Sequence, residues 1–284
     1  MTGAVTGAMT GAVSPATMQV LTGLLESRTG QQLAAYRSWR LDVALKPVMK
    51  ARDLPTLDAL VDALISCEDL LLADDIVDAL VNGETSFFRD APVFDAVAQA
   101  VAAIEAQGRR PRLWSAACAT GQEPLSLAMT FADRPPTPAA APDIVATDVS
   151  EGALARARAG RFTQFEVQRG LPIRRLLQWF EGRGDDWVAR PELLRAIHFR
   201  RLNLVADPAP PGRFDIVLCR NVMLYLAPAQ KARVFAMLAG ALAPGGLLVL
   251  GAGETVIGQT PLFAPSRRFR GLYEKIAEPA RVAA

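Results

Sequence analysis

Histidine and cysteine are scarce in this sequence of 284 residues. The single histidine is His198, and the three cysteines, Cys67, Cys118 and Cys219, lie at no metal-ligand spacing. One histidine excludes most histidine-based hydrolases and metal sites. An odd number of cysteines at these spacings argues against a disulfide framework or a zinc site. We therefore expect no bound metal and a reducing compartment.

A strong excess of one charge and long apolar runs are missing as well. The 31 Lys and Arg residues nearly balance the 29 Asp and Glu residues, which gives a net charge of +2. The whole chain therefore offers no electrostatic argument for nucleic acid or for a membrane surface. The most apolar stretch, Leu247 to Leu250, has the length of a strand. We expect a cytoplasmic protein that neither binds nucleic acid nor inserts into a membrane.

Residues 1–90 divide into a tail and a helical domain. The repeated small residues of MTGAVTGAMTGAV lack the features of a secretory signal, and we predict a disordered tail over residues 1–17. Apolar residues then recur at helix spacing as far as about Leu80, so we predict a small helical domain and a connecting segment over residues 18–90. One of its helices is basic, because it contains Arg37, Arg40, Lys46 and Lys50. These charges form either a solvated face or a docking surface.

Residues 91–284 alternate between short apolar strands and helices. Strands are predicted at 112–117, 143–147, 214–219 and 247–251, and a helix that stops at Gly245-Gly246 precedes the last of them. This alternation predicts an α/β domain with a doubly wound, mostly parallel Rossmann-like sheet. Residues 177–201 break the rhythm with a GRGDD turn between aromatic runs, and we interpret them as a small antiparallel insertion.

The predicted ligand site lies where the first strands end. The turn after the first strand contains Gly121 and Glu123, but it has neither a GxGxxG pattern nor a basic residue. Asp148 ends the second strand, where an acid commonly binds ribose hydroxyls. Acids without a phosphate cradle suit a cationic nucleoside such as S-adenosylmethionine (SAM). NAD is the rival, although it would require a glycine-rich pyrophosphate turn.

Five motifs in this order resemble the CheR-type chemotaxis receptor methyltransferases, which methylate glutamates on receptor signalling helices. The motifs are GETSFFRD (83–90), WSAACATGQEP (114–124), ATD (146–148), LNL (202–204) and FDIVLCRNVMLY (214–225). The resemblance implies a helical N-terminal domain linked to a SAM-binding domain with an antiparallel insertion. It also implies SAM as the methyl donor, S-adenosylhomocysteine as the product, and methyl-accepting chemotaxis proteins as partners.

The resemblance further assigns roles to individual residues. Glu123 would bind the methionine ammonium of SAM and Asp148 its ribose, with Asn203 and Leu204 on the adenine and ribose side. Arg89 and Tyr225 would lie beside the transferred methyl group as catalytic candidates, and Arg89 would also contact the cofactor. Other cofactor contacts are expected from the segment before the SAM-binding domain and from the ends of two strands, namely Thr85, Ala117, Gly121, Arg220 and Asn221.

Methylation of a glutamate needs no general base, because its carboxylate is already ionised at neutral pH. The insertion is short for the family, which suggests an enzyme that works without a tethering peptide at the receptor's C-terminus. The basic helix would dock on the acidic signalling helices. Two alternatives remain open: a SAM-dependent methyltransferase with another acceptor, and a cofactor-binding regulator without catalysis.

Overall fold

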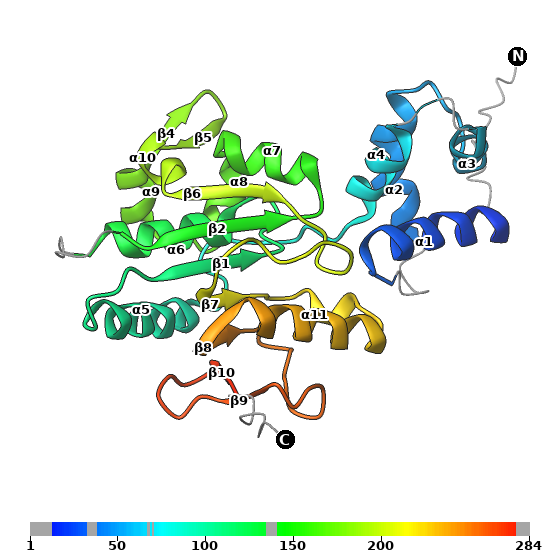
Figure 1. Cartoon of the computed structure of the whole chain (residues 1–284). Coiled ribbons are helices and arrows are strands. Elements are labelled where there is room, and N and C mark those ends of the chain that lie inside the picture. The colour runs from blue at the N-terminus through cyan, green and yellow to red at the C-terminus, as the bar shows by residue number, and fades with distance from the viewer. Residues whose placement is uncertain (1–12, 33–38, 67–68, 70, 135–140, 277–284) are drawn as a thin grey trace, which may run out of the picture. The chain divides into compact units, whose positions relative to one another are not determined.

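The computed structural model describes residues 13–32, 39–66, 69, 71–134 and 141–276 (Figure 1). The chain divides into two compact units, of which the first comprises Met1–Arg28 and Gln32–Val81 and the second Thr29–Gln31 and Asn82–Ala284. In the described residues, no helix has both the length and the apolar character that a membrane span requires.

The first unit is helical around an aliphatic core. Leucine, isoleucine and valine side chains recur three or four positions apart, so that each helix turns one apolar face inward. Arg52 donates hydrogen bonds to Asp69 at 2.7 Å and to Asp75 at 2.6 Å, which joins the loop after the second helix to the fourth helix. Its helices are α1 (Pro15–Thr29), α2 (Trp39–Lys50), α3 (Leu57–Ser66) and α4 (Leu72–Leu80).

The first helix starts inside the tail predicted over residues 1–17. Residues 1–12 of that tail lie outside the described residues, but α1 begins at Pro15. The side chain of Ser14 accepts a hydrogen bond from the backbone N–H of Thr17, as a helix-capping serine does. A serine followed by proline at the first helical position is a start signal that the tail prediction overlooked.

The second unit contains a seven-stranded sheet in the order β6-β2-β1-β7-β8-β10-β9. The first five of these strands are parallel, and β10 runs antiparallel to both of its neighbours. The doubly wound α/β fold predicted from the sequence is thereby confirmed. The strands are β1 (Arg112–Ala116), β2 (Asp143–Asp148), β6 (Ile197–Arg201), β7 (Phe214–Leu218), β8 (Leu242–Val249), β9 (Phe263–Pro265) and β10 (Tyr273–Lys275).

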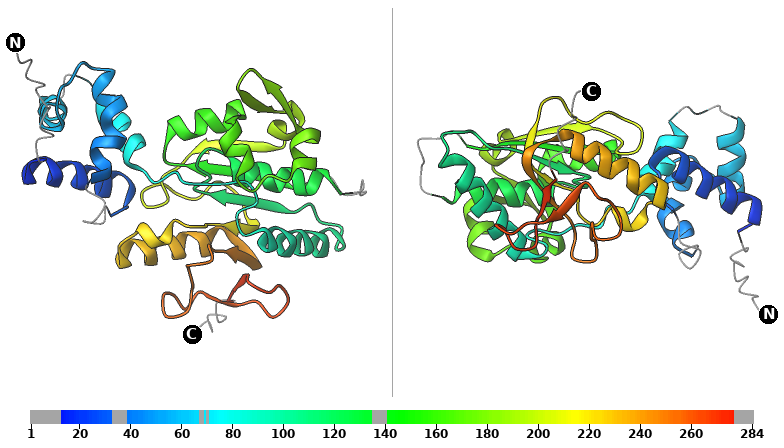
Figure 2. Two further views of the ribbon diagram at one scale, coloured as in Figure 1. Left: turned by 180° about the vertical axis from the view of Figure 1, so that it is seen from behind. Right: turned by 60° about the horizontal axis from the view of Figure 1, so that its bottom comes forward.

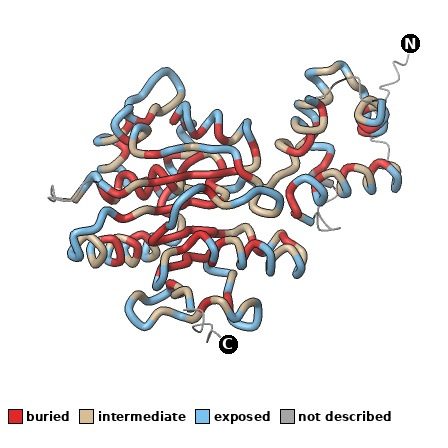
Figure 3. The backbone as a smooth tube through the Cα atoms, viewed as in Figure 1, coloured by how far each residue is buried: buried red, intermediate tan, exposed pale blue. Residues whose placement is uncertain are grey.

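Helices cover both faces of this sheet (Figure 2). One face packs against α5 (Ala91–Glu105), α6 (Gln122–Ala132), α7 (Glu151–Ala159) and α10 (Pro191–Arg195), and the other against α11 (Pro228–Ala241). The central strands are therefore buried on both sides (Figure 3), and they read as continuous apolar runs, as parallel strands do. The strand order reverses between β1 and β7, so the ligand crevice of such a sheet is expected at their carboxyl ends.

A separate three-stranded antiparallel sheet, in the order β3-β5-β4, is inserted before β6. It begins earlier and ends earlier than the predicted range of 177–201, because Arg161–Thr163 forms its first strand and Ile197–Arg201 belongs to the large sheet. Its elements are β3 (Arg161–Thr163), α8 (Gln164–Gln168), α9 (Ile173–Trp179), β4 (Phe180–Arg183) and β5 (Asp186–Ala189).

The predicted helix stop at Gly245-Gly246 is wrong. Helix α11 ends at Ala241, and both glycines lie inside β8. The pairing of β8 with β7 shifts register between Phe214 and Ile216, so the glycines occur where β8 is irregular. Pairing with a neighbouring strand decides the local structure here, and no helix-capping rule contains that information.

Candidate functional site

The predicted cofactor residues lie at one edge of the large sheet. Four neighbouring parallel strands, β6, β2, β1 and β7, end there, so the residues that follow them are brought together from distant parts of the sequence. These residues are Ala117, Gly121 and Glu123 after β1, Asp148 at the end of β2, Asn203 and Leu204 after β6, and Arg220 and Asn221 after β7.

The turn after β1 has an unusual backbone. Ala117, Ala119 and Gly121 all have positive φ, at 62°, 48° and 95°. Such values cost non-glycine residues about 1–3 kcal/mol each, and they concentrate at functional sites. Gly121 could not be replaced by a larger residue without strain, since a Cβ atom there would lie 2.8 Å from the Cβ of Ala157 in α7. The glycine thus allows α7 to pack closely against the start of α6.

Asp148 connects this turn to the end of β2. It is buried, and its Oδ2 accepts a hydrogen bond from the backbone N–H of Ala119 at 2.8 Å, while Oδ1 accepts one from Ser150 at 2.9 Å. An ionised carboxylate accepts hydrogen bonds and donates none, so its chemistry suits the hydroxyl groups of a ribose.

Glu123 lies in the first turn of α6, between a serine and an arginine. Its Oε1 accepts from Ser115 Oγ at 2.7 Å, and its Oε2 accepts from Arg220 Nη1 at 3.1 Å. Ser115 is a β1 residue for which the sequence suggested no role. A carboxylate has about four acceptor positions, so two of those of Glu123 are left for an ammonium group.

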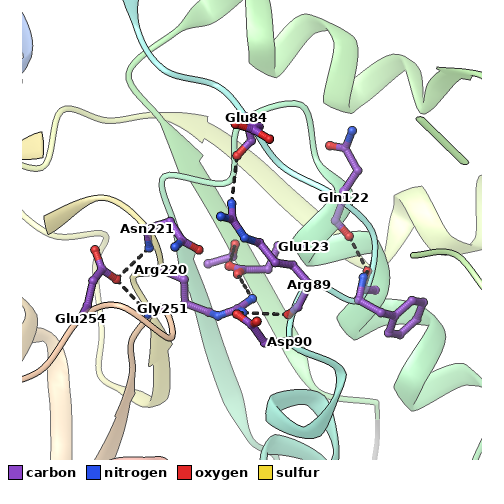
Figure 4. A network of polar contacts seen from close by, with 12 residues as sticks. Glu84, Arg89, Asp90, Gln122, Glu123, Arg220, Asn221, Gly251 and Glu254 are labelled. Atoms are coloured by element: carbon purple, nitrogen blue, oxygen red, sulfur yellow. Dashed lines mark hydrogen bonds and ion pairs between the residues drawn. The ribbon is translucent and has the colours of Figure 1, made fainter. Parts of the chain in front are cut away.

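Arg220 is turned inward among protein groups. Its side chain is 3% exposed, and its Nη2 donates to Asp90 Oδ2 at 2.6 Å and to the carbonyl oxygen of Arg89 at 2.7 Å. Figure 4 shows this guanidinium between Asp90 and Glu123. The planar fork of arginine is suited to several simultaneous acceptors. Arg220 thus connects the end of β7 to α6 and to the segment that precedes α5.

That segment, Asn82–Asp90, contains the FFR motif and is held by close packing. Phe87 is fully buried and makes edge-to-face contacts with Phe162 and Phe180 of the inserted sheet. The backbone N–H of Phe88 donates to Ser126 Oγ in α6 at 3.0 Å. Both phenylalanines are core residues, whereas Thr85 and Arg89 of the same segment are half-buried.

Of the two predicted catalytic residues, Arg89 belongs to this segment and Tyr225 contacts it. Arg89 Nη1 donates to the carbonyl oxygen of Glu84 at 3.3 Å. Tyr225 lies in a short 3₁₀ helix, Met223–Tyr225, and its phenol oxygen accepts a hydrogen bond from the side-chain amide of Asn82. Asn82 is not among the predicted site residues. Its contact with Tyr225 depends on the tertiary fold, and no local sequence signal indicates it.

The remaining predicted residues are placed as follows. Asn203 is half-buried, and its Oδ1 accepts from the backbone N–H of Val205 at 2.9 Å, while Leu204 packs partly against the α11 side of the core. The predicted docking residues belong to the first unit. Lys46 and Lys50 are exposed on α2, one helical turn apart, Arg40 is the second residue of α2, and Arg37 lies outside the described residues.

The site also contains a thiol that is unsuited to act as a nucleophile or a base. Cys118 lies in the turn after β1, and burial, with smaller contributions from Asp148 and Glu123, raises its pKa well above the ordinary value. Thiols with raised pKa values are poor nucleophiles and poor bases. Cys118 is therefore a packing residue.

Comparison with known proteins defines the class. Residues 83–269 match the family described as CheR methyltransferase, SAM binding domain. A chemotaxis protein methyltransferase of Vibrio parahaemolyticus is 35% identical over 89% of this chain and 94% of its own length. Chemotaxis protein methyltransferase 1 of Pseudomonas aeruginosa is 35% identical over 85% and 90%. The SAM-bound amino pentose methyltransferase CalS10 aligns over 59% of this chain and 52% of its own, at 20% identity and a TM-score of only 0.35.

Fold, site and family match define a SAM-dependent methyltransferase. The chain belongs to the CheR methyltransferase family, as its motifs suggested. SAM rather than NAD is thus the cofactor, and the acidic residues of the site suit its ammonium and ribose groups.

Proposed function

We propose that this enzyme methylates glutamate side chains on the signalling helices of chemotaxis receptors and forms glutamate methyl esters. The observation that carries the proposal is the similarity, along 89% of the chain, to a protein named chemotaxis protein methyltransferase. Receptor methylation of this kind would serve adaptation in chemotaxis-type signalling.

The position of the single histidine, far from the site, supports an acceptor that needs no general base. The single histidine, His198, is the second residue of β6 and lies at the amino end of that strand, 3.5 Å from Asp143, whereas the site lies at the carboxyl ends. A glutamate with a reference pKa of about 4.3 is ionised without help at neutral pH. The enzyme then has to orient and partly desolvate the acceptor.

We assign cofactor binding to the residues at the sheet edge. SAM supplies an electrophilic methyl group on its sulfonium. Glu123 would bind the ammonium and Asp148 the ribose hydroxyls, while Asn203 and Leu204 would line the adenine side. The turn at Ala117 and Gly121, together with Thr85 and Asn221, would complete the pocket. Because the Arg220 side chain is already used by protein groups, we assign it the positioning of Glu123.

Arg89 and Tyr225 are the proposed catalytic residues. The Arg89 guanidinium can bind the incoming carboxylate through two parallel hydrogen bonds. The Tyr225 phenol accepts a hydrogen bond from Asn82, and a phenol O–H is also a donor group that suits a carboxylate oxygen. Together they would hold the acceptor oxygen in line with the methyl group.

The basic helix α2 is proposed to dock on the acidic receptor helices. Reversing the charge at Arg40 and Lys50 should raise KM for the receptor roughly fivefold or more, since each exposed pair contributes about 0.2–1 kcal/mol. The affinity for SAM should not change. The exposed Arg195 of α10, reversed to Glu, is the matched control. Unchanged receptor methylation in the α2 variant would exclude this docking mode.

The inserted sheet is proposed to work without a tethering peptide. Its strands β4 and β5 are joined by only two residues, Gly184 and Asp185, so the insertion is small. Calorimetry with the C-terminal peptide of the receptor should detect no binding. Tight binding of that peptide would contradict this part of the proposal.

The reaction class is tested with radiolabelled SAM and a receptor cytoplasmic fragment. We expect label on the fragment that mild base releases as volatile methanol, and no label when the acceptor glutamates are changed to alanine. Base-stable label would indicate a different acceptor atom. Bound SAM without any transfer, measured by calorimetry with several receptors, would indicate a regulator instead of an enzyme.

A further inference from the structure

Glu254 is a half-buried acid in the turn after β8, and its sequence context suggested no role. Its carboxylate accepts three backbone hydrogen bonds. Oε2 accepts from the N–H groups of Asn221 and Gly251, both at 2.8 Å, and Oε1 accepts from Leu224 at 3.4 Å (Figure 4 shows the first two). One side chain thereby joins the turns that follow two neighbouring strands, β7 and β8.

The turn after β7 needs such support. Asn221 has a φ of 59°, a left-handed conformation that costs energy in any residue with a side chain. Its amide lies directly against Gly251, where an added Cβ would be 2.7 Å from Asn221 Nδ2. Backbone N–H groups that converge on one carboxylate stabilise a conformation that the chain would otherwise avoid.

The same turn leads directly to Tyr225. Leu224, which donates to Glu254, precedes it, and Met223–Tyr225 form a 3₁₀ helix. The phenol is bound separately by Asn82. Tyr225 is thus fixed at its backbone through Glu254 and at its hydroxyl through Asn82.

We propose that Glu254 is a positioning residue, which sets the location of Tyr225 for methyl transfer without itself touching the reacting atoms. This inference rests on the proposed function, in which Tyr225 acts on the acceptor. It predicts that Glu254 influences the chemical step more than cofactor binding, because the residues assigned to the ammonium and ribose, Glu123 and Asp148, are held by other partners.

The test uses the full chain with Glu254→Gln, which keeps the size of the side chain but removes its charge. Glu166→Gln is the matched control, since Glu166 also accepts a backbone N–H, that of Thr163 at 2.9 Å, in the capping box of α8. We expect kcat for receptor methylation to fall roughly 10- to 100-fold in Glu254→Gln, as a small misplacement of a catalytic group does. The Kd for SAM should stay within about twofold of its original value.

A double-mutant cycle identifies the residue through which Glu254 acts. In a Tyr225→Phe background, Glu254→Gln should cost much less than it does alone, because coupled residues are not additive. Additive effects, or a loss of SAM affinity with kcat unchanged, would overturn the inference. If the wild type methylates a different acceptor, the proposed function fails, but the same cycle on that acceptor still tests Glu254.

A readout independent of activity is available as well. The chain has three tyrosines, so ring-labelled tyrosine gives a simple NMR spectrum in which Tyr225→Phe identifies one resonance. That resonance should shift in Glu254→Gln and stay in place in Glu166→Gln. An unmoved Tyr225 signal would contradict the positioning role even if no acceptor were found.

Discussion

The side-chain amide of Asn82 donates a hydrogen bond to the phenol oxygen of Tyr225, 143 positions further along the chain. Asn82 opens the segment that contains the FFR motif, and Tyr225 closes the motif that begins with β7. The contact therefore connects the two motifs from which both proposed catalytic residues come. It also restricts the directions in which the phenol proton can point, since one side of the oxygen is occupied by the amide.

Replacing Asn82 should slow methyl transfer without loss of SAM affinity. In Asn82→Ala the phenol loses one neutral hydrogen bond, worth about 0.5–1.5 kcal/mol, so kcat should fall roughly 2- to 12-fold. Asn82→Asp should be at least as harmful, because a carboxylate would accept the phenol proton itself. Steady-state kinetics with the receptor fragment measures both. Gln99→Ala, an exposed change on α5, is the control, and equal rates in all three variants would show that the contact does not matter.

Arg220 is predicted from the sequence as a cofactor contact, but its replacement should mainly reduce the stability of the fold. Replacement by methionine leaves Glu123 and Asp90 without their shared cation, and breaking such buried pairs costs about 3–5 kcal/mol; the partial exposure of Asp90 reduces this to about 2–4 kcal/mol. Urea unfolding measures the change. Arg183→Met, which removes an exposed pair with Glu181, should cost less than about 1 kcal/mol. Lower SAM affinity with unchanged unfolding would instead favour a direct cofactor contact.

The strands and the acids that follow them could be predicted from the sequence for a physical reason. A parallel strand buried on both faces is apolar throughout, so β1, β2 and β7 are visible as short runs. Asp148 ends β2 and Glu123 lies at the start of the helix after β1, and adjacent parallel strands end at one edge. Local pattern and topology together suffice for this part of the site.

The interactions that hold the site together could not be predicted in this way. Asn82, Ser115 and Glu254 are ordinary turn or strand residues locally, and their roles arise from partners that lie far away in the sequence. The side-chain direction of Arg220 depends on the position of Asp90, which no periodicity specifies. The motif resemblance identified which positions matter, and the tertiary contacts identify which groups they bind.

Gly170, between α8 and α9 of the insertion, packs directly against the FFR segment, so replacing it should displace that segment. It has a φ of +86°, and a Cβ atom there would lie 2.1 Å from the carbonyl oxygen of Phe87. Gly170→Ala should therefore destabilise the protein by about 2–5 kcal/mol, from the left-handed conformation and from overpacking, and it should reduce methyl transfer by displacing Phe87. Gly182→Ala in β4, where an added Cβ meets nothing within 4 Å, is the control. Thermal unfolding and kcat that match in the two variants would contradict the close approach.

The buried thiols should make the protein less stable in alkali. Burial raises the pKa of Cys118 and of Cys219 well above the ordinary value of 9.0, so both remain protonated in the folded protein. In the unfolded chain both thiols ionise near pH 9. Above this pH the unfolded chain therefore binds fewer protons than the folded chain. The free energy of unfolding therefore falls as the pH rises above 9, and the contribution of the two thiols is complete below that value. Urea unfolding at pH 7.5 and 10 should show a smaller alkaline loss in Cys118→Ala than in the wild type. Equal losses, or rapid labelling of Cys118 by a thiol reagent in the native protein at pH 8, would contradict a raised pKa.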